Sequence, residues 1–247
     1  MKKLFLTFAV LAVGASAVSA QDREIDLESL NDFNKIELSH EGARVETDLK
    51  IAFPMYFGTS VLSNVSYKGD WALADQTNFL NTRTAKNFVY GLELASMHVH
   101  YGALDMSLGL RWTFMDFTFS DPKVSMKRVG NSYVPYLISL ENPGYDFNKS
   151  KIHASYFGIP LRVGFNIGRA TVYAGASAEL LTNGYTKYKR PKTRTQAKDL
   201  FNPFRATVEG GFSWGNLGVF VMYGLTPLFP DSLSDARTVT FGLTLGI

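Results

Sequence analysis

Apolar and small polar residues alternate along the stretch Arg237-Thr-Val-Thr-Phe-Gly-Leu-Thr-Leu-Gly-Ile247. Successive side chains of a β-strand point to opposite faces of its sheet, so this stretch predicts a strand with one apolar face and one face of threonine and glycine. Seven further stretches of ten or more residues alternate in the same way. Soluble sheets rarely contain so many long strands of this kind, and the repetition favours a sheet that spans a membrane.

The seven other stretches begin near Val45, Ala85, Leu104, Lys151, Ala170, Asn202 and Leu217. The period of two is clearest over 104–114 and weakest over 217–228, where Phe220 and Met222 lie on the otherwise polar face. Turns of two or three residues alternate with long polar connections: the turns are at 100–102, 168–169 and 215–216, and the long connections at 58–84, 120–150, 185–201 and 229–235. Short turns at one rim and long loops at the other are typical of outer-membrane barrels.

The predicted fold is therefore all-β, an eight-stranded antiparallel up-and-down transmembrane β-barrel. A sheet in hydrocarbon must close on itself because every backbone polar group needs a partner within the protein. Side chains fill the interior of an eight-stranded barrel, and buried charges need partners there. Ten charged residues are predicted on the inner faces: Glu46, Asp48, Lys50, Glu93, Asp105, Arg111, Arg162, Glu179, Arg205 and Glu209. A secreted β-sandwich is the alternative, but its solvent-facing strand positions would carry more charge.

Three segments are predicted along the chain. Residues 1–20 are typical of a signal peptide, with Lys2 and Lys3 before an apolar run and small residues at 18–20. An N-terminal anchor helix is the less favoured alternative, since Gly14 and Ser16 interrupt the run. Residues 21–42 are a periplasmic lead-in with one short strand around Lys35 to Ser39, and residues 43–247 are the barrel.

Composition excludes several classes of function. The chain contains no cysteine, so disulfides, thiolate metal sites and a lipid-modified cysteine anchor are excluded. Removing Lys2 and Lys3 with the signal peptide leaves 23 of the 25 lysines and arginines against 22 acidic residues, a formal charge of +1. This balance, without a long basic block, gives no support for a nucleic-acid partner.

Three motifs resemble those of small outer-membrane barrel proteins of Bacteroidetes-type bacteria, the PorT-like group. They are Tyr-Phe-Gly-Ile-Pro-Leu-Arg-Val-Gly-Phe at 156–165, Tyr-Gly-Leu-Thr-Pro-Leu-Phe at 223–229 and Thr-Phe-Gly-Leu-Thr-Leu-Gly-Ile at 240–247. The resemblance covers roughly 45–247 and implies the barrel fold, with no catalytic residue common to the group. The last motif also looks like the signal read by the barrel-assembly machinery, although Ile247 stands where an aromatic residue is usual.

Histidines give the main candidate sites. His98 and His100 share one strand face, which we predict to point outward at the periplasmic rim, where a role among lipid head groups is favoured over a metal site. His153 lies near Ser155 at the outer end of a strand, and Asp146 or Asp121 would complete an enzyme site from the loop. No GxSxG, HExxH or P-loop motif is present. We predict no catalytic residue, no metal and no cofactor.

Cations beside tyrosines mark two loops. One carries Lys123, Lys127 and Arg128; the other carries Lys187, Lys189, Arg190, Lys192 and Arg194. These residues suit lipopolysaccharide phosphates, glycans or protein partners, and also plain solvated loops. Trp112, Phe114, Phe157 and Tyr56 are predicted at the outer membrane interface and Trp214 at the inner one.

The predicted protein is thus a non-catalytic outer-membrane barrel with a filled lumen. Its expected role is structural, in surface contact, or as an accessory to an outer-membrane complex. Expected partners are outer-membrane lipid and lipopolysaccharide, the barrel-assembly machinery during insertion, and a protein or glycan at the loops. The alternatives are an outer-membrane enzyme acting on lipid or peptide, and a small channel or carrier for hydrophobic ligands.

Overall fold

The computed structural model describes residues 35–40, 43–50, 54–74, 78–190 and 192–246, and for 35–50 only the backbone. The predicted signal peptide and most of the predicted lead-in lie outside the described residues. Among the described residues, no helix combines the length and the apolar character needed to cross a membrane.

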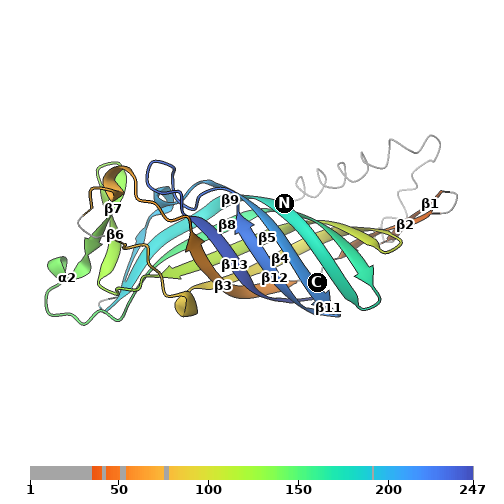
Figure 1. The fold of residues 1–247 in the computed structure, drawn as a ribbon, viewed down its shortest axis with the longest axis horizontal. Helices are drawn as coiled ribbons and strands as arrows, with labels where there is room; N and C mark the ends of the chain where they lie inside the picture. Colours follow the sequence, from red (N-terminus) through yellow and green to blue (C-terminus); the bar gives the residue numbers. More distant parts are fainter. Residues whose placement is uncertain (1–34, 41–42, 51–53, 75–77, 191, 247) are drawn as a thin grey trace, which may run out of the picture. The chain divides into compact units, whose positions relative to one another are not determined.

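Eight antiparallel strands form a closed barrel (Figure 1). Each strand pairs with the next one along the chain, and the last strand pairs back with the first, so the predicted up-and-down topology is confirmed. The strands are β3 (Met55–Ser63), β4 (Phe88–Tyr101), β5 (Leu104–Thr118), β8 (Lys149–Ile167), β9 (Ala170–Lys189), β11 (Phe204–Trp214), β12 (Leu217–Gly224) and β13 (Arg237–Leu245).

The first predicted strand is divided in the structure. β2 (Ala43–Lys50) pairs with the Ser96–Tyr101 end of β4, whereas β3 pairs with its Val89–Leu92 end. Pro54, just before β3, has no backbone N–H to give to a ladder, and its carbonyl accepts a bond from the Glu93 N–H at 3.0 Å. β1 (Lys35–His40) pairs with β2, which confirms the short strand predicted in the lead-in.

The two ends of the barrel differ as predicted. At one end Gly102, Gly168 and Gly215 take φ values of +60°, +65° and +59°, which glycine adopts readily in tight turns. The long loops at the other end contain structure that was not predicted: the hairpin of β6 (Val124–Val129) and β7 (Ser132–Leu137), the helix α2 (Ile138–Glu141), strand β10 (Thr193–Gln196) beside β9, and the 3-10 turns η2 (Gly69–Trp71), η3 (Thr84–Lys86) and η4 (Lys198–Leu200).

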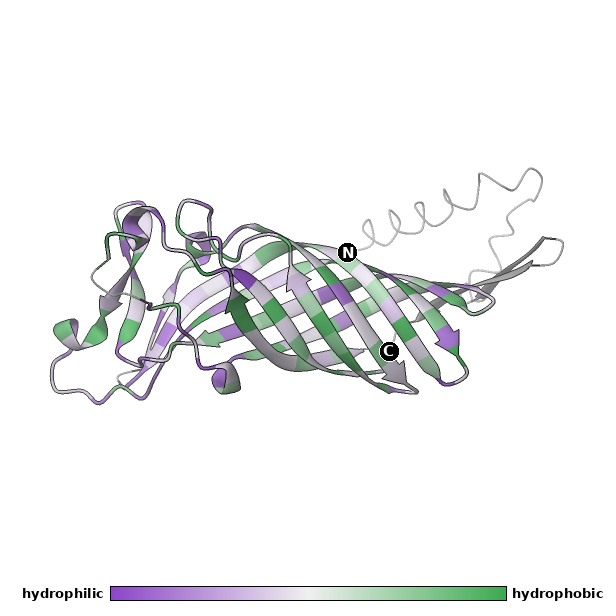
Figure 2. Cartoon of the chain, viewed as in Figure 1, coloured by the Kyte–Doolittle hydropathy of each residue, from purple (hydrophilic) through white to green (hydrophobic). Residues whose placement is uncertain are grey.

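Apolar side chains cover the outside of the barrel wall. Along β8 the outward residues Ile159, Leu161, Val163, Phe165 and Ile167 are 42–63% exposed, and Figure 2 shows the alternation of apolar and polar residues along the strands. So large an apolar surface is unusual on a soluble protein, and hydrocarbon is the environment that suits it.

An aromatic cluster marks the outer membrane interface on β4 and β5. The ring of Phe114 stacks on Tyr90 at 4.7 Å and on Trp112 at 5.3 Å between centroids. Tyr56 was predicted to join this girdle, and that prediction is wrong. It lies inside the barrel, 5% exposed, with its hydroxyl 2.5 Å from that of Thr113, because even-numbered positions of β3 point inward.

Two β-bulges change which residues face outward. On β4 the pairing with β5 shifts between Glu93 and Ala95, so Leu94 is an extra residue. On β9 the pairing with β8 passes from Leu181 to Asn183, so Thr182 is extra. One added residue reverses the face of every later side chain in the strand. Consequently, His98 and His100 point into the barrel mouth, and their predicted outward orientation is wrong.

Candidate functional sites in the lumen and at the two rims

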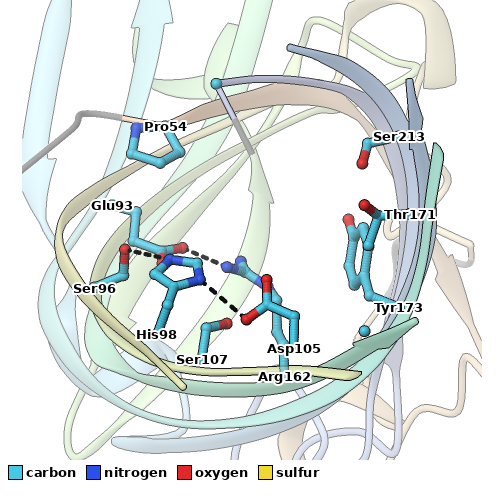
Figure 3. A pocket seen from close by; sticks show the side chains of 12 residues that line it. Pro54, Glu93, Ser96, His98, Asp105, Ser107, Arg162, Thr171, Tyr173 and Ser213 are labelled. Atoms are coloured by element: carbon cyan, nitrogen blue, oxygen red, sulfur yellow. Dashed lines mark hydrogen bonds and ion pairs between the residues drawn. The ribbon is translucent and has the colours of Figure 1, made fainter. Parts of the chain in front are cut away.

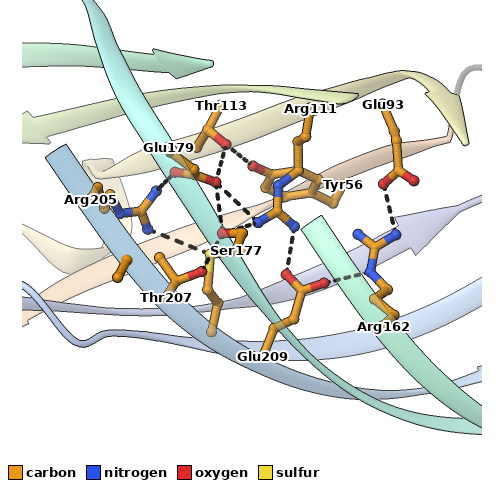
Figure 4. Close-up of polar contacts among 12 residues, drawn as sticks. Tyr56, Glu93, Arg111, Thr113, Arg162, Ser177, Glu179, Arg205, Thr207 and Glu209 are labelled. Atoms are coloured by element: carbon orange, nitrogen blue, oxygen red, sulfur yellow. Dashed lines mark hydrogen bonds and ion pairs between the residues drawn. The ribbon is translucent and has the colours of Figure 1, made fainter. Parts of the chain in front are cut away.

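A network of three arginines and three glutamates crosses the lumen (Figure 4). Arg111 on β5 is its centre, bonded to Glu179 on β9 at 3.0 Å and to Glu209 on β11 at 2.5 Å. Arg162 on β8 links Glu209 to Glu93 on β4, the latter at 2.7 Å. Arg205 on β11 bonds Glu179 at 2.7 Å. The charges of these six residues sum to zero, so the network is neutral as a whole.

The network is buried, and its carboxylates and most guanidinium nitrogens are paired; within the described residues, Arg111 Nε and Arg205 Nε are the network atoms that are buried without a hydrogen-bond partner. Each of the six residues is at most 8% exposed. Ser177 donates to Glu179 and accepts a bond from Arg111 at 2.8 Å, which adds a partner to the ion pairs. Each guanidinium also lies near a tyrosine ring: Arg111 near Tyr56, Arg162 near Tyr173 and Arg205 near Tyr156, at 5.4–5.8 Å from the ring centroids. These partners offset the cost of removing charges from water.

All six network residues belong to the ten predicted on the inner faces. A seventh, Asp105, lies at the periplasmic mouth, where it lines a cavity. Glu46, Asp48 and Lys50 lie on β2, whose side chains are outside the described part of the structure.

An apolar cluster of loop residues lies at the extracellular end. Trp71 packs edge-on against Phe79 and Phe229, each at 5.0 Å between centroids, and Phe229 stacks on Phe201. The Trp71 indole N–H donates to the carbonyl of Tyr133 at 2.6 Å, which ties the first loop to the β6–β7 hairpin.

An ion pair joins the first and last loops. Lys68 lies 2.6 Å from Asp235, and Ser66 donates to the same carboxylate at 3.0 Å. These two hydrogen bonds hold the pKa of Asp235 below its ordinary value. The extracellular loops are therefore connected to one another by both apolar and polar contacts.

Four lysines form a cluster on the outer face near the extracellular rim, which we call the lysine patch: Lys149, Lys151, Lys187 and Lys189. They line a cavity of about 180 Å³. Lys149 lies directly opposite Lys189 in the β8–β9 register, and Lys151 opposite Lys187. Arg194 on β10 lies opposite Lys187 on its other side. Within the described part of the chain, Lys151 is the one member of the patch with a salt bridge, to Asp116.

The residues proposed for an enzyme site are not arranged as a triad. His153 Nδ1 lies 2.7 Å from Asp116 on β5, and its ring stacks on Tyr185 at 4.4 Å. The acidic partner is therefore neither Asp146 nor Asp121, the two candidates from the sequence; Asp121 instead accepts the N–H of Lys123. The Ser155 hydroxyl bonds to that of Thr182 at 2.9 Å. The structure thus brings His153 to an acid but gives Ser155 a different partner.

His98, His100 and Asp105 meet at the periplasmic mouth. Both histidines are on β4 and the aspartate is on β5, across the turn at Gly102. His98 and Asp105 line a cavity of about 90 Å³ with Glu93, Arg162 and Tyr173 (Figure 3). Sequence reasoning paired His98 with His100 but placed them on the outer face and missed Asp105 as their partner, because nothing in the sequence distinguishes Leu94 as an extra residue.

Comparison with known protein families identifies the family to which this barrel belongs. The family described as outer membrane protein beta-barrel domain matches residues 50–230 of the chain. The chain belongs to this family. Membership of this family places the protein in the outer membrane.

Other comparisons add little to the family assignment. The crystal structure of Neisserial surface protein A matches with 11% sequence identity and a TM-score of 0.37, over 81% of this chain and 99% of that chain. No curated protein matches the chain significantly.

Proposed function

We propose that this outer-membrane barrel is a non-catalytic, non-conducting protein that serves envelope structure and surface contact. The observation that carries the proposal is the neutral network of Arg111, Arg162, Arg205, Glu93, Glu179 and Glu209 across the lumen. A channel needs a continuous aqueous path, and here side chains from β4, β5, β8, β9 and β11 meet one another across the interior. The lumen of an eight-stranded barrel is just wide enough for such filling.

The proposal also covers how the protein is exported and inserted, and to which group of barrel proteins it belongs. Export would use residues 1–20 as a cleaved signal peptide, and insertion would use the barrel-assembly machinery. The motifs at 156–165 and 223–229 support placement in the PorT-like group and service to a larger outer-membrane complex. The pairing of Ser155 with Thr182 supports a role without catalysis.

The sealed lumen predicts the electrical behaviour of the purified protein. The folded barrel, inserted into a planar bilayer, should show no steady conductance, because the ion pairs of Arg111 leave no continuous water column. A general porin recorded in the same bilayers provides the positive control. Repeated unitary steps that scale with salt concentration would refute the sealed lumen and favour the channel alternative.

For a partner, we propose the phosphate groups of outer-leaflet glycolipid, bound at the lysine patch. The patch lies two residues beyond the His153–Tyr185 pair along β8 and β9, a displacement of about 7 Å at the usual strand rise. His153 in turn lies 6.4 Å from Phe114 of the outer aromatic cluster. The lysines therefore lie just above the aromatic level, where the head groups of the outer leaflet begin.

The charge arrangement of the patch supports an anionic partner. Like charges directly opposite one another in a sheet are destabilising, and here two successive lysine pairs face each other. Among the four lysines, only Lys151 forms a salt bridge within the described structure, and its partner is Asp116. A phosphate in the cavity between β8 and β9 would offset the repulsion among the others and accept several charge-assisted hydrogen bonds.

Neutralising the patch should weaken binding of phosphorylated glycolipid. We expect the variant Lys149→Gln with Lys187→Gln to bind bis-phosphorylated lipid A at least about tenfold more weakly, since each lost charge-assisted contact typically contributes about 1.5–3 kcal/mol. Native mass spectrometry of the barrel with lipid A and with its dephosphorylated form measures this. The control variant, Lys123→Gln with Lys198→Gln, removes two exposed loop lysines outside the patch. Equal lipid A binding by the two variants would contradict the proposal, as would equal binding of the dephosphorylated lipid.

A further inference from the structure

The histidines turned inward by the β4 bulge form a cluster with metal-ligand chemistry. His98 Nδ1 lies 3.3 Å from Asp105 Oδ1, and His100 Nδ1 lies 3.6 Å from the same oxygen. One ligand atom from each of the three residues lies within 4.8 Å of the others. The two imidazole rings stack at 5.9 Å with an angle of 16° between their planes, as neighbours two apart on one strand face do.

The two separations from Asp105 match those between donors in a four-coordinate metal site. Zn²⁺ binds histidine nitrogen and carboxylate oxygen at about 2.0–2.2 Å, and at tetrahedral angles two such donors lie about 3.3–3.6 Å apart. The distances from Asp105 to both histidines fall in that range. A metal ion would thus bind with little movement of β4 or β5.

A hydrogen bond orients one of the histidines. His98 Nε2 lies 3.0 Å from the hydroxyl of Ser96, which is two residues earlier on the same inward face. In the tautomer in which Nε2–H donates to Ser96, Nδ1 carries the lone pair directed toward Asp105. Metal-binding histidines usually hold their second nitrogen in such a bond, which fixes the tautomer and the ring.

The surroundings also permit a bound cation. Arg162 lines the same cavity, but Glu93 and Glu209 neutralise it, so its charge does not exclude a metal. The cavity of about 90 Å³ has room for water as a further ligand. In the β2–β4 register, Glu46 lies opposite His100 and Asp48 opposite His98, so β2 brings two acidic positions to the same rows.

We propose that His98, His100 and Asp105 bind a divalent transition metal ion, Zn²⁺ in the first place, at the periplasmic mouth of the barrel. Two imidazoles and one carboxylate suit Zn²⁺ and its neighbours Co²⁺, Ni²⁺ and Cu²⁺ rather than Ca²⁺ or Mg²⁺, which prefer oxygen ligands. The fourth position faces the cavity. The ion connects β4 to β5 beside their turn, and this site is independent of whether the lumen conducts.

Metal titration of the tag-free, refolded full chain in detergent tests the proposal. Competition with a Zn²⁺ indicator should show one ion per chain, and Co²⁺ should give the visible absorption bands of a four-coordinate site. The variants His98→Ala, His100→Ala and Asp105→Asn should each weaken Zn²⁺ binding at least about tenfold. His153→Ala removes a histidine at the opposite end of the barrel, and this control variant should bind as the unchanged protein does.

A second measurement needs no substitution. Zn²⁺ should shift the imidazole NMR signals of His98 and His100 in the unchanged protein and leave those of His153 in place, so poor folding of a variant cannot hide the answer. Absence of saturable binding, Zn²⁺ affinity unchanged in the folded double variant His98→Ala with His100→Ala, or shifts confined to other histidines would each overturn the proposal.

Discussion

Replacing Glu209 with alanine is expected to destabilise the folded barrel by about 3–5 kcal/mol, the cost of breaking a buried ion pair from one side. Glu209 accepts bonds from both Arg111 and Arg162, which are 1% and 8% exposed. Without it the lumen carries an unbalanced and largely buried positive charge. Urea unfolding in lipid vesicles, followed by tryptophan fluorescence, measures the loss.

Glu141→Ala is the matched control for this substitution. Glu141 also forms an ion pair, with Lys127 at 2.7 Å, but both side chains are 46% exposed. Exposed pairs contribute about 0–1 kcal/mol, so this variant should unfold almost as the unchanged protein does. Adding Arg111→Met to Glu209→Ala should recover part of the lost stability, because it removes the uncompensated charge. Equal stability of the Glu209 and Glu141 variants would show that the lumen network is not tightly buried.

Replacing Gly58 with valine is expected to prevent closure of the barrel. Gly58 on β3 lies opposite Gly242 on β13, at the seam where the last strand meets the first. A Cβ atom at Gly58 would lie 2.1 Å from the carbonyl oxygen of Phe241 and 2.8 Å from the Cα of Gly242. Relief requires the two backbones to separate, and the ladder that closes the sheet would be lost. The folded barrel should then fail to appear as the faster-migrating band in unheated gel electrophoresis.

Gly210→Ala is the control for the seam. Gly210 lies within β11, paired on both sides, yet a Cβ there would meet only the carbonyl oxygen of Tyr173, at an ordinary 3.6 Å. This variant should fold, and Gly58→Ala should fall between the two because its single methyl group still meets backbone. Normal folding of Gly58→Val would mean that the seam is looser than the structure shows.

Period-two alternation carried most of the prediction of the fold. It placed Arg111, Arg162, Glu179, Arg205 and Glu209 inside because strands β5, β8, β9 and β11 are regular where these residues lie. Glycine at the turns and the alternation of short and long connections then determined the topology. The contacts within the network follow from closure, which brings β5 and β11 across the lumen from one another, and no local pattern contains that information.

The sites at the rims were less predictable, for a physical reason. Alternation predicts which side chains face inward only as far as the first bulge of a strand. Neither Leu94 nor Thr182, the extra residues at the two bulges, differs in type from a regular strand residue. His98 and His100 come after the first bulge, and Lys187 and Lys189 after the second. The partner of His153 was missed because β5 extends to Thr118, beyond the stretch whose alternation was clearest.

The inserted residues Leu94 and Thr182 mark the points along β4 and β9 beyond which different side chains are tolerated on the outer and inner faces. Between them, hydrocarbon constrains the outward positions, so substitution there is restricted to apolar side chains. Past either insertion, the strand turns the opposite set of positions outward: past Leu94 the histidines of β4 face the barrel mouth, and past Thr182 the lysines of β9 face the surroundings. Gain or loss of one codon at such a point would exchange the inward and outward side chains of that strand at the rim while the bilayer-crossing middle stayed intact, giving this scaffold a short mutational route to new surface properties.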